Sequence, residues 1–209
     1  MHEELHQFVR NDVRELVPRP KGVNVIGTKW IFKNKFDEHG TVIRNKSRLV
    51  TQGYTQVKGV DFDKTFALVA RLEYIRILLA IASHLNFKLY QMDVKSAFLN
   101  GMLQEEVYVE QPKGFVNHHR PDNVYKLKRV LYGLKQVPQA WYDRLIVYLT
   151  EHEFKRGSAN TTLFIRKDKN SFVVAQIYVD DIVFGATNDS LAHSFADEMK
   201  AMFEMSMVG

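Results

Sequence analysis

Apolar and polar positions alternate over several short stretches of the chain, and this period of two predicts strands that bury one face. The clearest stretch is 172–185, which is almost wholly apolar except where the adjacent carboxylates Asp180 and Asp181 interrupt it. We predict a β-hairpin there, with strands at 172–179 and 182–185 and both aspartates at the turn.

A longer period of three to four residues marks the helices. An apolar stripe at this spacing consists of Leu72, Ile75, Leu78, Leu79, Ala82 and Leu85, and Ile77 and Ile81 widen it. The stripe predicts a buried helix before a strand at 87–92, and further helices are expected at 140–152 and 190–203. Helices mixed with hairpins indicate an α+β fold.

Charge singles out a second predicted hairpin, with strands at 29–36 and 41–52 and Gly40 at a turn position that needs positive φ. The chain of 209 residues has a net charge of +5. The segment 29–58 holds two acidic residues and the basic residues Lys29, Lys33, Lys35, Arg44, Lys46, Arg48 and Lys58. Such a hairpin favours binding of phosphates or nucleic acid, and a solvated charged strand face is the alternative.

Composition narrows the class of protein. The absence of cysteine excludes disulfides and thiolate metal sites. The first residues have no secretory pattern, and no stretch has the length of a membrane span. We therefore expect a soluble intracellular chain with no membrane partner.

Two adjacent aspartates in an apolar run are costly, because ionised carboxylates 4 Å apart repel by about 4 kcal/mol at protein-like dielectric. A divalent cation between Asp180 and Asp181 would relieve this, although aspartate is also an ordinary turn residue. Asp93, at the end of the strand 87–92, is a third candidate ligand. With Ser96 it could equally mark a helix entry.

Asp93 with Phe98 five positions later, together with Tyr178-Val179-Asp180-Asp181, resembles the palm of reverse transcriptases. Further blocks resemble the copia-type retrotransposon polymerase of plants, and the likeness runs from about residue 12 to the C-terminus. These blocks are Lys29 to Lys33, Lys46 to Gln56, Gln91 to Gly101, Val107 to Phe115, Leu131 to Gln136 and Ala140 to Tyr142.

The resemblance implies a reverse-transcriptase palm and fingers with an antiparallel sheet and flanking helices. A leader helix is expected in 1–20 and the polymerase domain in 21–209. Within that domain, the fingers hairpin would occupy about 29–52 and the palm about 72–209. Most of the thumb and the ribonuclease H domain would be missing.

By the same resemblance the chain is an RNA-directed DNA polymerase, acting on an RNA or DNA template with a primer and on deoxynucleoside triphosphates. Asp93, Asp180 and Asp181 would hold two Mg²⁺ ions, with Mn²⁺ as the alternative ion. Asp93 and Asp180 would be the main bridging ligands, and Asp181 would assist the metal on the primer side.

Nucleotide contacts are also implied. Lys46 and Arg48, two positions apart on one strand face, would clamp the triphosphate. Phe98 would pack under the deoxyribose and clash with a 2′-hydroxyl, although without the resemblance it could equally be a core residue. Gln139 resembles a glutamine that contacts the incoming nucleotide, where copia-type chains usually carry arginine. The residues expected to contact nucleic acid are Lys29, Lys33, Lys35 and Tyr178.

Two residues depart from the family pattern, since Leu68 replaces a usual proline and Lys64 an acidic residue. Three hypotheses follow: a polymerase domain, an inactive relic that at most binds nucleic acid, and a metal-dependent nuclease. The nuclease is the weakest, because Phe98 and the basic hairpin serve nucleotide selection and have no evident use in hydrolysis.

Overall fold

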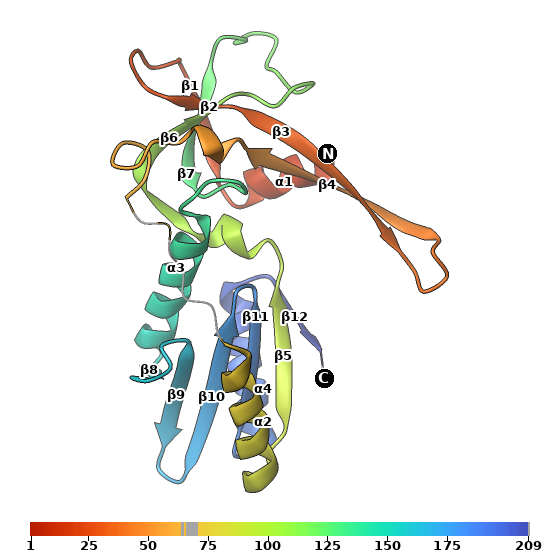
Figure 1. The fold of residues 1–209 in the computed structure, drawn as a ribbon, viewed down its shortest axis with the longest axis vertical. Coiled ribbons are helices and arrows are strands. Elements are labelled where there is room, and N and C mark those ends of the chain that lie inside the picture. The colour runs from red at the N-terminus through yellow and green to blue at the C-terminus, as the bar shows by residue number, and fades with distance from the viewer. Residues whose placement is uncertain (64, 66–70, 209) are drawn as a thin grey trace. The chain divides into compact units, whose positions relative to one another are not determined.

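The computed structural model describes residues 1–63, 65 and 71–208, which form two compact units (Figure 1). The first unit takes its residues from 1–65 and 98–140, and the second from 71–97 and 141–208. Each unit therefore combines segments that are distant in sequence. The departures Lys64 and Leu68 lie outside the described residues.

The first unit is built on a four-stranded sheet in the order β1-β7-β6-β2. Its strands are β1 (Arg14–Val17), β2 (Val25–Ile26), β6 (Met102–Val109) and β7 (Val124–Arg129). The unit also holds α1 (His2–Arg10), the 3₁₀ turn η1 (Gly53–Thr55) and most of η2 (Ala97–Asn100). Its core consists of Phe8, Val13, Ile26, Leu49, Leu99, Val107, Val109, Leu127, Val130, Leu131, Leu134 and Val137. The helix expected in 1–20 is thus α1, and β1 follows it into the sheet.

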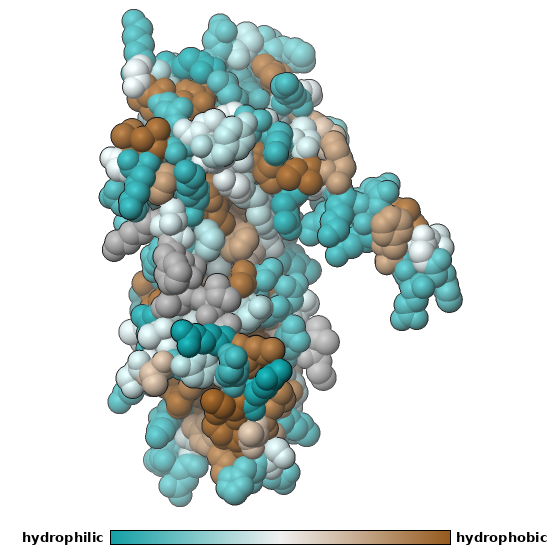
Figure 2. All heavy atoms as spheres, viewed as in Figure 1, coloured by the Kyte–Doolittle hydropathy of each residue, from teal (hydrophilic) through white to brown (hydrophobic). Residues whose placement is uncertain are grey.

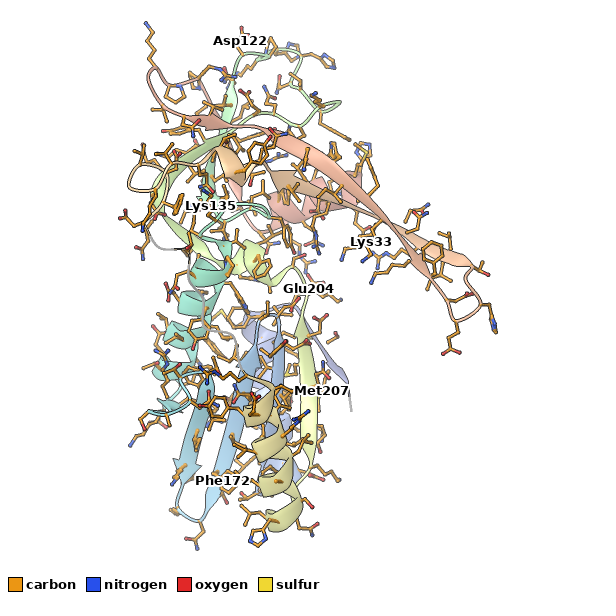
Figure 3. All side chains as sticks on the ribbon, in the orientation of Figure 1. Lys33, Asp122, Lys135, Phe172, Glu204 and Met207 are labelled. Carbon is orange, nitrogen blue, oxygen red and sulfur yellow. The ribbon has the colours of Figure 1, made fainter. Side chains whose placement is uncertain are left out.

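The hairpin of β3 (Thr28–Phe36) and β4 (Val42–Thr51) lies where the sequence predicts it. Its turn contains Gly40 at φ 80°, as expected. The distal half extends beyond the other strands of the unit (Figure 1), and Figure 3 shows Lys33 on this part. Long two-stranded ribbons gain little stability by themselves, so the base of the hairpin has to be anchored elsewhere in the unit.

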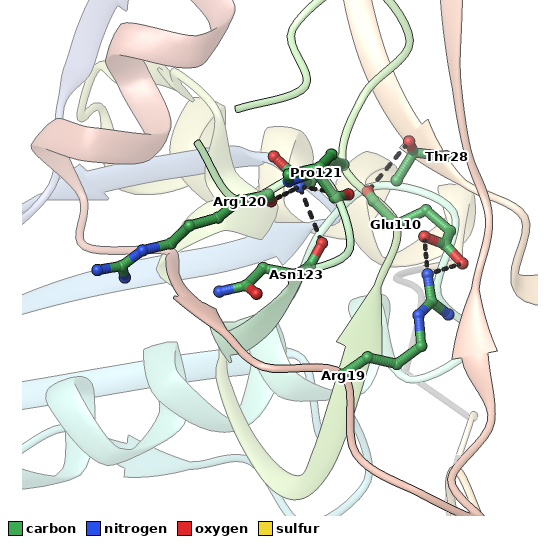
Figure 4. Close-up of polar contacts among 7 residues, drawn as sticks. Arg19, Thr28, Glu110, Arg120, Pro121 and Asn123 are labelled. Atoms are coloured by element: carbon green, nitrogen blue, oxygen red, sulfur yellow. Dashed lines mark hydrogen bonds and ion pairs between the residues drawn. The ribbon is translucent and has the colours of Figure 1, made fainter. Parts of the chain in front are cut away.

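The base of the hairpin is anchored partly through the segment that follows β6 (Figure 4). Thr28 donates its hydroxyl to the carbonyl of Glu110 at 3.3 Å, and the Glu110 carboxylate binds Arg19 at 2.7 Å. The next residue, Gln111, is buried, and its amide donates to the carbonyls of Arg120, Pro121 and Asn123. One glutamine therefore fixes a loop that has no helix or strand of its own.

The second unit contains a six-stranded sheet in the order β12-β5-β11-β10-β9-β8, in which every neighbouring pair of strands is antiparallel. The strands are β5 (Leu89–Val94), β8 (Lys155–Arg156), β9 (Leu163–Asp168), β10 (Ser171–Tyr178), β11 (Asp181–Ala186) and β12 (Met205–Val208). Its helices are α2 (Leu72–Leu85), α4 (Asp189–Met202) and most of α3 (Val137–Glu151). The expected helices at 140–152 and 190–203 are confirmed as α3 and α4.

Helices lie on both faces of this sheet (Figure 1). Phe184 of β11 packs edge-on against Phe195 of α4 with ring centroids 5.0 Å apart, so α4 covers that face. The N-cap Asn188 starts α4 by accepting from the Leu191 amide at 2.9 Å. The opposite face carries Phe172 and Val174, which line a groove of about 540 Å³ together with α2.

The prediction of a buried α2 is wrong, although the helix lies where expected. Only Leu78 and Ala82 of its stripe are buried, whereas Leu72, Leu79 and Leu85 are more than half exposed. In Figure 2 the brown residues that gather in the lower part of the view lie over this helix. A helix that contacts a sheet along one narrow line buries one residue per turn, and nothing among the described residues covers the remainder of its stripe.

An α+β class is confirmed by this mixture of helices and antiparallel strands. Within the described part of the chain, no helix combines the length and apolar character needed to cross a membrane.

One ion pair joins α4 to β9 of the sheet and gives a pH-dependent prediction. Arg166 donates to both carboxylate oxygens of Glu198, at 2.8 and 3.1 Å, and both side chains are less than a third exposed. These hydrogen bonds lower the pKa of Glu198 below its ordinary value of 4.5. The ionised carboxylate therefore stabilises the fold above about pH 4.5, and this stabilisation is lost as the pH falls through the folded-state pKa.

We predict that Glu198→Gln lowers the free energy of unfolding by about 1 kcal/mol at pH 7 and by less near pH 3, where part of the stabilisation is already lost. Urea denaturation at the two pH values measures this. The exposed Glu151→Gln on α3 is the control and should change neither value. An equal loss for Glu198→Gln at both pH values would contradict the assigned role of the carboxylate charge.

Candidate active site

A row of polar side chains crosses four strands on one face of the six-stranded sheet. Tyr178 on β10 is the register partner of Asp181 on β11, Asp181 is the partner of Asp93 on β5, and Asp93 is the partner of Ser206 on β12. Directly opposed residues share a face of a sheet. The pairing of β5 with β11 therefore brings together two of the three predicted aspartates.

Asp93 and Asp181 occupy the closer type of antiparallel pair. The Val94 amide donates to the Asp180 carbonyl at 3.0 Å, which makes the neighbouring Val94 and Asp180 the hydrogen-bonded pair. Asp93 and Asp181 consequently form a non-hydrogen-bonded pair, in which side chains approach more closely. Like charges placed directly opposite each other destabilise a sheet, so a cation at this point would be bound favourably.

Gln91 supports this pair and was not predicted from the sequence. It lies two positions before Asp93 on β5, and its amide donates to Asp181 Oδ1 at 3.0 Å. Alternate residues of a strand share a face, so Gln91 was expected on the same face as Asp93. This spacing was the only feature of the sequence that could have indicated a role for Gln91 at the site. The hydrogen bond orients one carboxylate toward its partner strand.

The position of Asp181 differs from the prediction. It is the first residue of β11, and the two-residue turn consists of Val179 and Asp180. The structure thus pairs Asp93 with Asp181, while Asp180 is exposed in the turn. Among the residues that the structure describes, no group of three or more histidine, cysteine, aspartate or glutamate side chains is gathered closely enough to hold a metal ion.

The donor set nevertheless suits a divalent cation. Asp93 and Asp181 offer carboxylate oxygens, which Mg²⁺ and Mn²⁺ prefer, and both side chains are partly exposed. Mg²⁺ commonly keeps several waters and takes only one or two carboxylates from the protein. A two-carboxylate site therefore fits this ion.

The turn before Asp181 has an unusual backbone. Val179 has φ 58°, whereas Asp180 is not among the residues with positive φ. Positive φ at the first central position alone is typical of a type II′ turn, where glycine is preferred and a β-branched residue is strained. The Val179 carbonyl accepts from Trp141 Nε1 at 2.8 Å, and Trp141 is buried. This hydrogen bond helps to hold the strained turn.

All six basic residues of the β3–β4 hairpin lie on one face, and Lys58, the seventh basic residue of the segment 29–58, lies outside the hairpin. The register pairs Lys35 with Arg44 and Lys33 with Lys46, and it pairs Ile31 with Arg48. Because side chains alternate between faces, this basic face consists of Lys29, Lys33, Lys35, Arg44, Lys46 and Arg48, together with Ile31 and Val50. The predicted common face of Lys46 and Arg48 is confirmed.

Electrostatic repulsion on the basic face affects Lys46. Burial lowers the pKa of its ammonium group, and the charges of Arg48, Lys35 and Arg44 lower it further, while Glu4 opposes them. An anionic ligand would relieve this crowding. The face is therefore suited to phosphate groups.

The other residues predicted to contact the nucleotide or the nucleic acid are Phe98, Gln139 and Tyr178. Phe98 is in η2, partly buried against Tyr132, with ring centroids 5.6 Å apart. Gln139 lies in the first turn of α3. Tyr178, the last residue of β10, is 39% exposed beside Asp181.

Comparison with known proteins decides the family. The family model described as reverse transcriptase (RNA-dependent DNA polymerase) matches residues 11–209. The chain belongs to the reverse transcriptase family. It is 38% identical over 206 residues to the retrovirus-related Pol polyprotein from transposon RE1 of Arabidopsis thaliana. The matched region covers 98% of this chain and 14% of that protein.

Other relatives extend the comparison. The Pol polyprotein from transposon TNT 1-94 of Nicotiana tabacum is 35% identical over 100% of this chain and 16% of its own length. The transposon Ty1-GR1 Gag-Pol polyprotein of Saccharomyces cerevisiae is 26% identical over 99% of this chain and 12% of its own length. The expected kinship with copia-type Pol polyproteins of plants is confirmed. This reverse transcriptase segment spans about one seventh of the plant relatives' length.

The strained turn gives a prediction about stability. Replacing Val179 by glycine removes the steric cost of positive φ, so Val179→Gly should raise the free energy of unfolding by about 1 kcal/mol. Val183→Gly on β11 is the matched control, because Val183 is also partly buried but is not among the residues with positive φ. It should lower stability by about 1 kcal/mol or more. Chemical denaturation measures both, and a comparable loss in the two variants would show that the turn is not strained.

Proposed function

We propose that this reverse transcriptase segment carries the polymerase chemistry of the family: addition of deoxynucleotides to a primer paired with an RNA or DNA template. The observation that carries the proposal is the in-register pair of Asp93 and Asp181, with Asp180 adjacent in the turn. Family membership supports the reaction class, and the carboxylate chemistry supports the use of divalent ions.

In this proposal Asp93, Asp180 and Asp181 are the catalytic carboxylates and hold two Mg²⁺ ions, or Mn²⁺ in their place. Once bound, such ions would activate the primer 3′-hydroxyl and neutralise charge on the leaving pyrophosphate. Gln91 keeps Asp181 oriented through its hydrogen bond, and the Trp141 contact fixes the turn that bears Asp180. Tyr178, exposed beside Asp181, would contact the nucleic acid.

The first unit supplies phosphate binding in the same proposal. Lys46 and Arg48 contact the triphosphate, and Lys29, Lys33 and Lys35 contact the nucleic-acid backbone. Their shared face supports this assignment, since one strand of phosphates can meet several cations there at once. Phe98 packs against the deoxyribose, and Gln139 contacts the incoming nucleotide.

A relic that binds nucleic acid without polymerising is the second candidate. The basic face is built entirely from the β3–β4 register and does not depend on the carboxylate pair. Loss of chemistry would therefore leave binding intact. The two candidates separate when extension and binding are measured on the same protein.

The decisive experiment is Mg²⁺-dependent extension of a DNA primer on an RNA template. We expect Asp93→Asn, Asp180→Asn and Asp181→Asn each to reduce extension by at least about a hundredfold while template binding is retained. Asp197→Asn, an exposed position on α4, is the control and should extend normally. Binding without extension in the unaltered protein would favour the relic, and extension that survives all three substitutions would reject the carboxylate assignment.

The basic face gives a separate prediction. The double variant Lys33→Gln/Lys35→Gln should weaken single-stranded RNA binding and reduce the slope of log affinity against log salt by about 1.4, at about 0.7 per phosphate contact. Lys155→Gln/Lys200→Gln removes the same charge from exposed positions on β8 and α4 and should leave the slope unchanged. Fluorescence anisotropy over a salt series measures both, and equal slopes for the two double variants would rule out the basic face as the binding surface.

A further inference from the structure

Tyr132 links two predicted nucleotide-contacting residues of the first unit. The Arg48 guanidinium carbon lies 4.1 Å from the centroid of the Tyr132 ring, which is a cation–π contact. The Phe98 ring packs against the same tyrosine at 5.6 Å between centroids and 71° between planes. Tyr132 is itself only partly buried. One aromatic side chain thus contacts both Arg48 and Phe98, which come from different parts of the chain.

The backbone at Tyr132 is fastened to the end of β4. Its carbonyl accepts from both the amide and the hydroxyl of Thr51, at 2.7 and 3.1 Å. Gly133 has φ 97°, and a Cβ there would lie 2.2 Å from the Thr51 carbonyl oxygen. A Cβ on Gly53 would lie 2.0 Å from the Gly133 carbonyl oxygen. The two glycines therefore permit a close approach of the backbones of residues 51, 53 and 133. This approach fixes the position of the Tyr132 backbone, from which the ring extends.

A ring held in this way restricts both of its neighbours. The Arg48 guanidinium carbon lies over the face of the ring. A guanidinium held on an aromatic ring by its central carbon can still offer N–H groups to phosphate oxygens. Phe98 rests edge-on against the ring, so it cannot retreat in that direction. Steric rejection of a ribose 2′-hydroxyl requires such rigidity, because an aromatic wall that yields by 1 Å no longer discriminates.

We propose that Tyr132 is a positioning residue that fixes Phe98 and Arg48 and so determines the preference for deoxynucleotides over ribonucleotides. This inference rests on the proposed function, since it concerns the nucleotide site of the same reaction. Tyr132 acts through its two neighbours and need not touch the substrate. The role belongs to the aromatic ring and not to the hydroxyl group.

The test compares Tyr132→Leu with Tyr132→Phe by measuring kcat/KM for dATP and for ATP in primer extension. Tyr132→Leu removes both ring contacts and should reduce the preference for dATP roughly tenfold, with a higher KM for dATP. Tyr132→Phe keeps the ring and should recover the preference of the unaltered protein. A preference that is unchanged in Tyr132→Leu would overturn the proposal.

Tyr125→Leu is the matched control. Tyr125 is also partly buried in the first unit, and the Arg14 guanidinium lies over its ring at 3.9 Å. The same substitution at an equivalent cation–π pair should affect stability without changing the ratio of dATP to ATP use.

If Tyr132→Leu does not fold, as judged by circular dichroism, Tyr132→His takes its place, and its smaller ring should give an intermediate preference.

Binding measurements separate failure of this inference from failure of the proposed function. Affinities for dATP and ATP are measured by isothermal titration calorimetry with the template–primer and Ca²⁺. If the unaltered protein does not extend primers but binds dATP more tightly than ATP, the polymerase proposal fails and the Tyr132 inference is judged on that preference. If it prefers neither nucleotide in extension or in binding, the Tyr132 inference is wrong.

Discussion

The antiparallel register between β5 and β11 is the constraint on which the candidate site depends. It places Asp93 opposite Asp181 and, through the neighbouring strands, adds Tyr178 and Ser206 to the same row. A slip by one residue would turn Asp93 to the buried face and bring a core side chain such as Met92 or Val94 to the surface. The apolar residues that alternate with the polar row therefore specify its position.

Much of this arrangement could be predicted because it follows from local patterns. Both hairpins, the glycine turn and the common face of Lys46 and Arg48 follow from a period of two and from turn chemistry. The positions of α3 and α4 follow from a helical period. The pairing of Asp93 with the hairpin was expected only through resemblance to reverse transcriptases, because contacts between distant segments have no local signal.

Features that depend on tertiary packing could not be predicted. The stripe of α2 identifies a helix, but its burial depends on which surfaces are available to cover it, and Leu72 remains exposed. A strained φ at Val179 requires support from Trp141, which lies in another element. Tyr132 has no sequence signal for its position between Arg48 and Phe98, since their packing depends on the close approach of Gly133 to Thr51.

Each unit also contains one surface on which like charges lie close together. The sheet of the second unit sets two carboxylates opposite each other, and the hairpin of the first unit gathers six basic side chains on one face. Neither arrangement favours stability by itself, because like charges at short range destabilise the folded state. The surrounding packing has to offset that cost: buried core residues adjoin the carboxylate pair, and α1 and the loop at Tyr132 pack against the base of the hairpin. A cation bound at the Asp93–Asp181 pair, or phosphates bound on the basic face of the hairpin, would remove the repulsion between like charges. The same charges that destabilise the free protein would therefore contribute directly to ligand affinity.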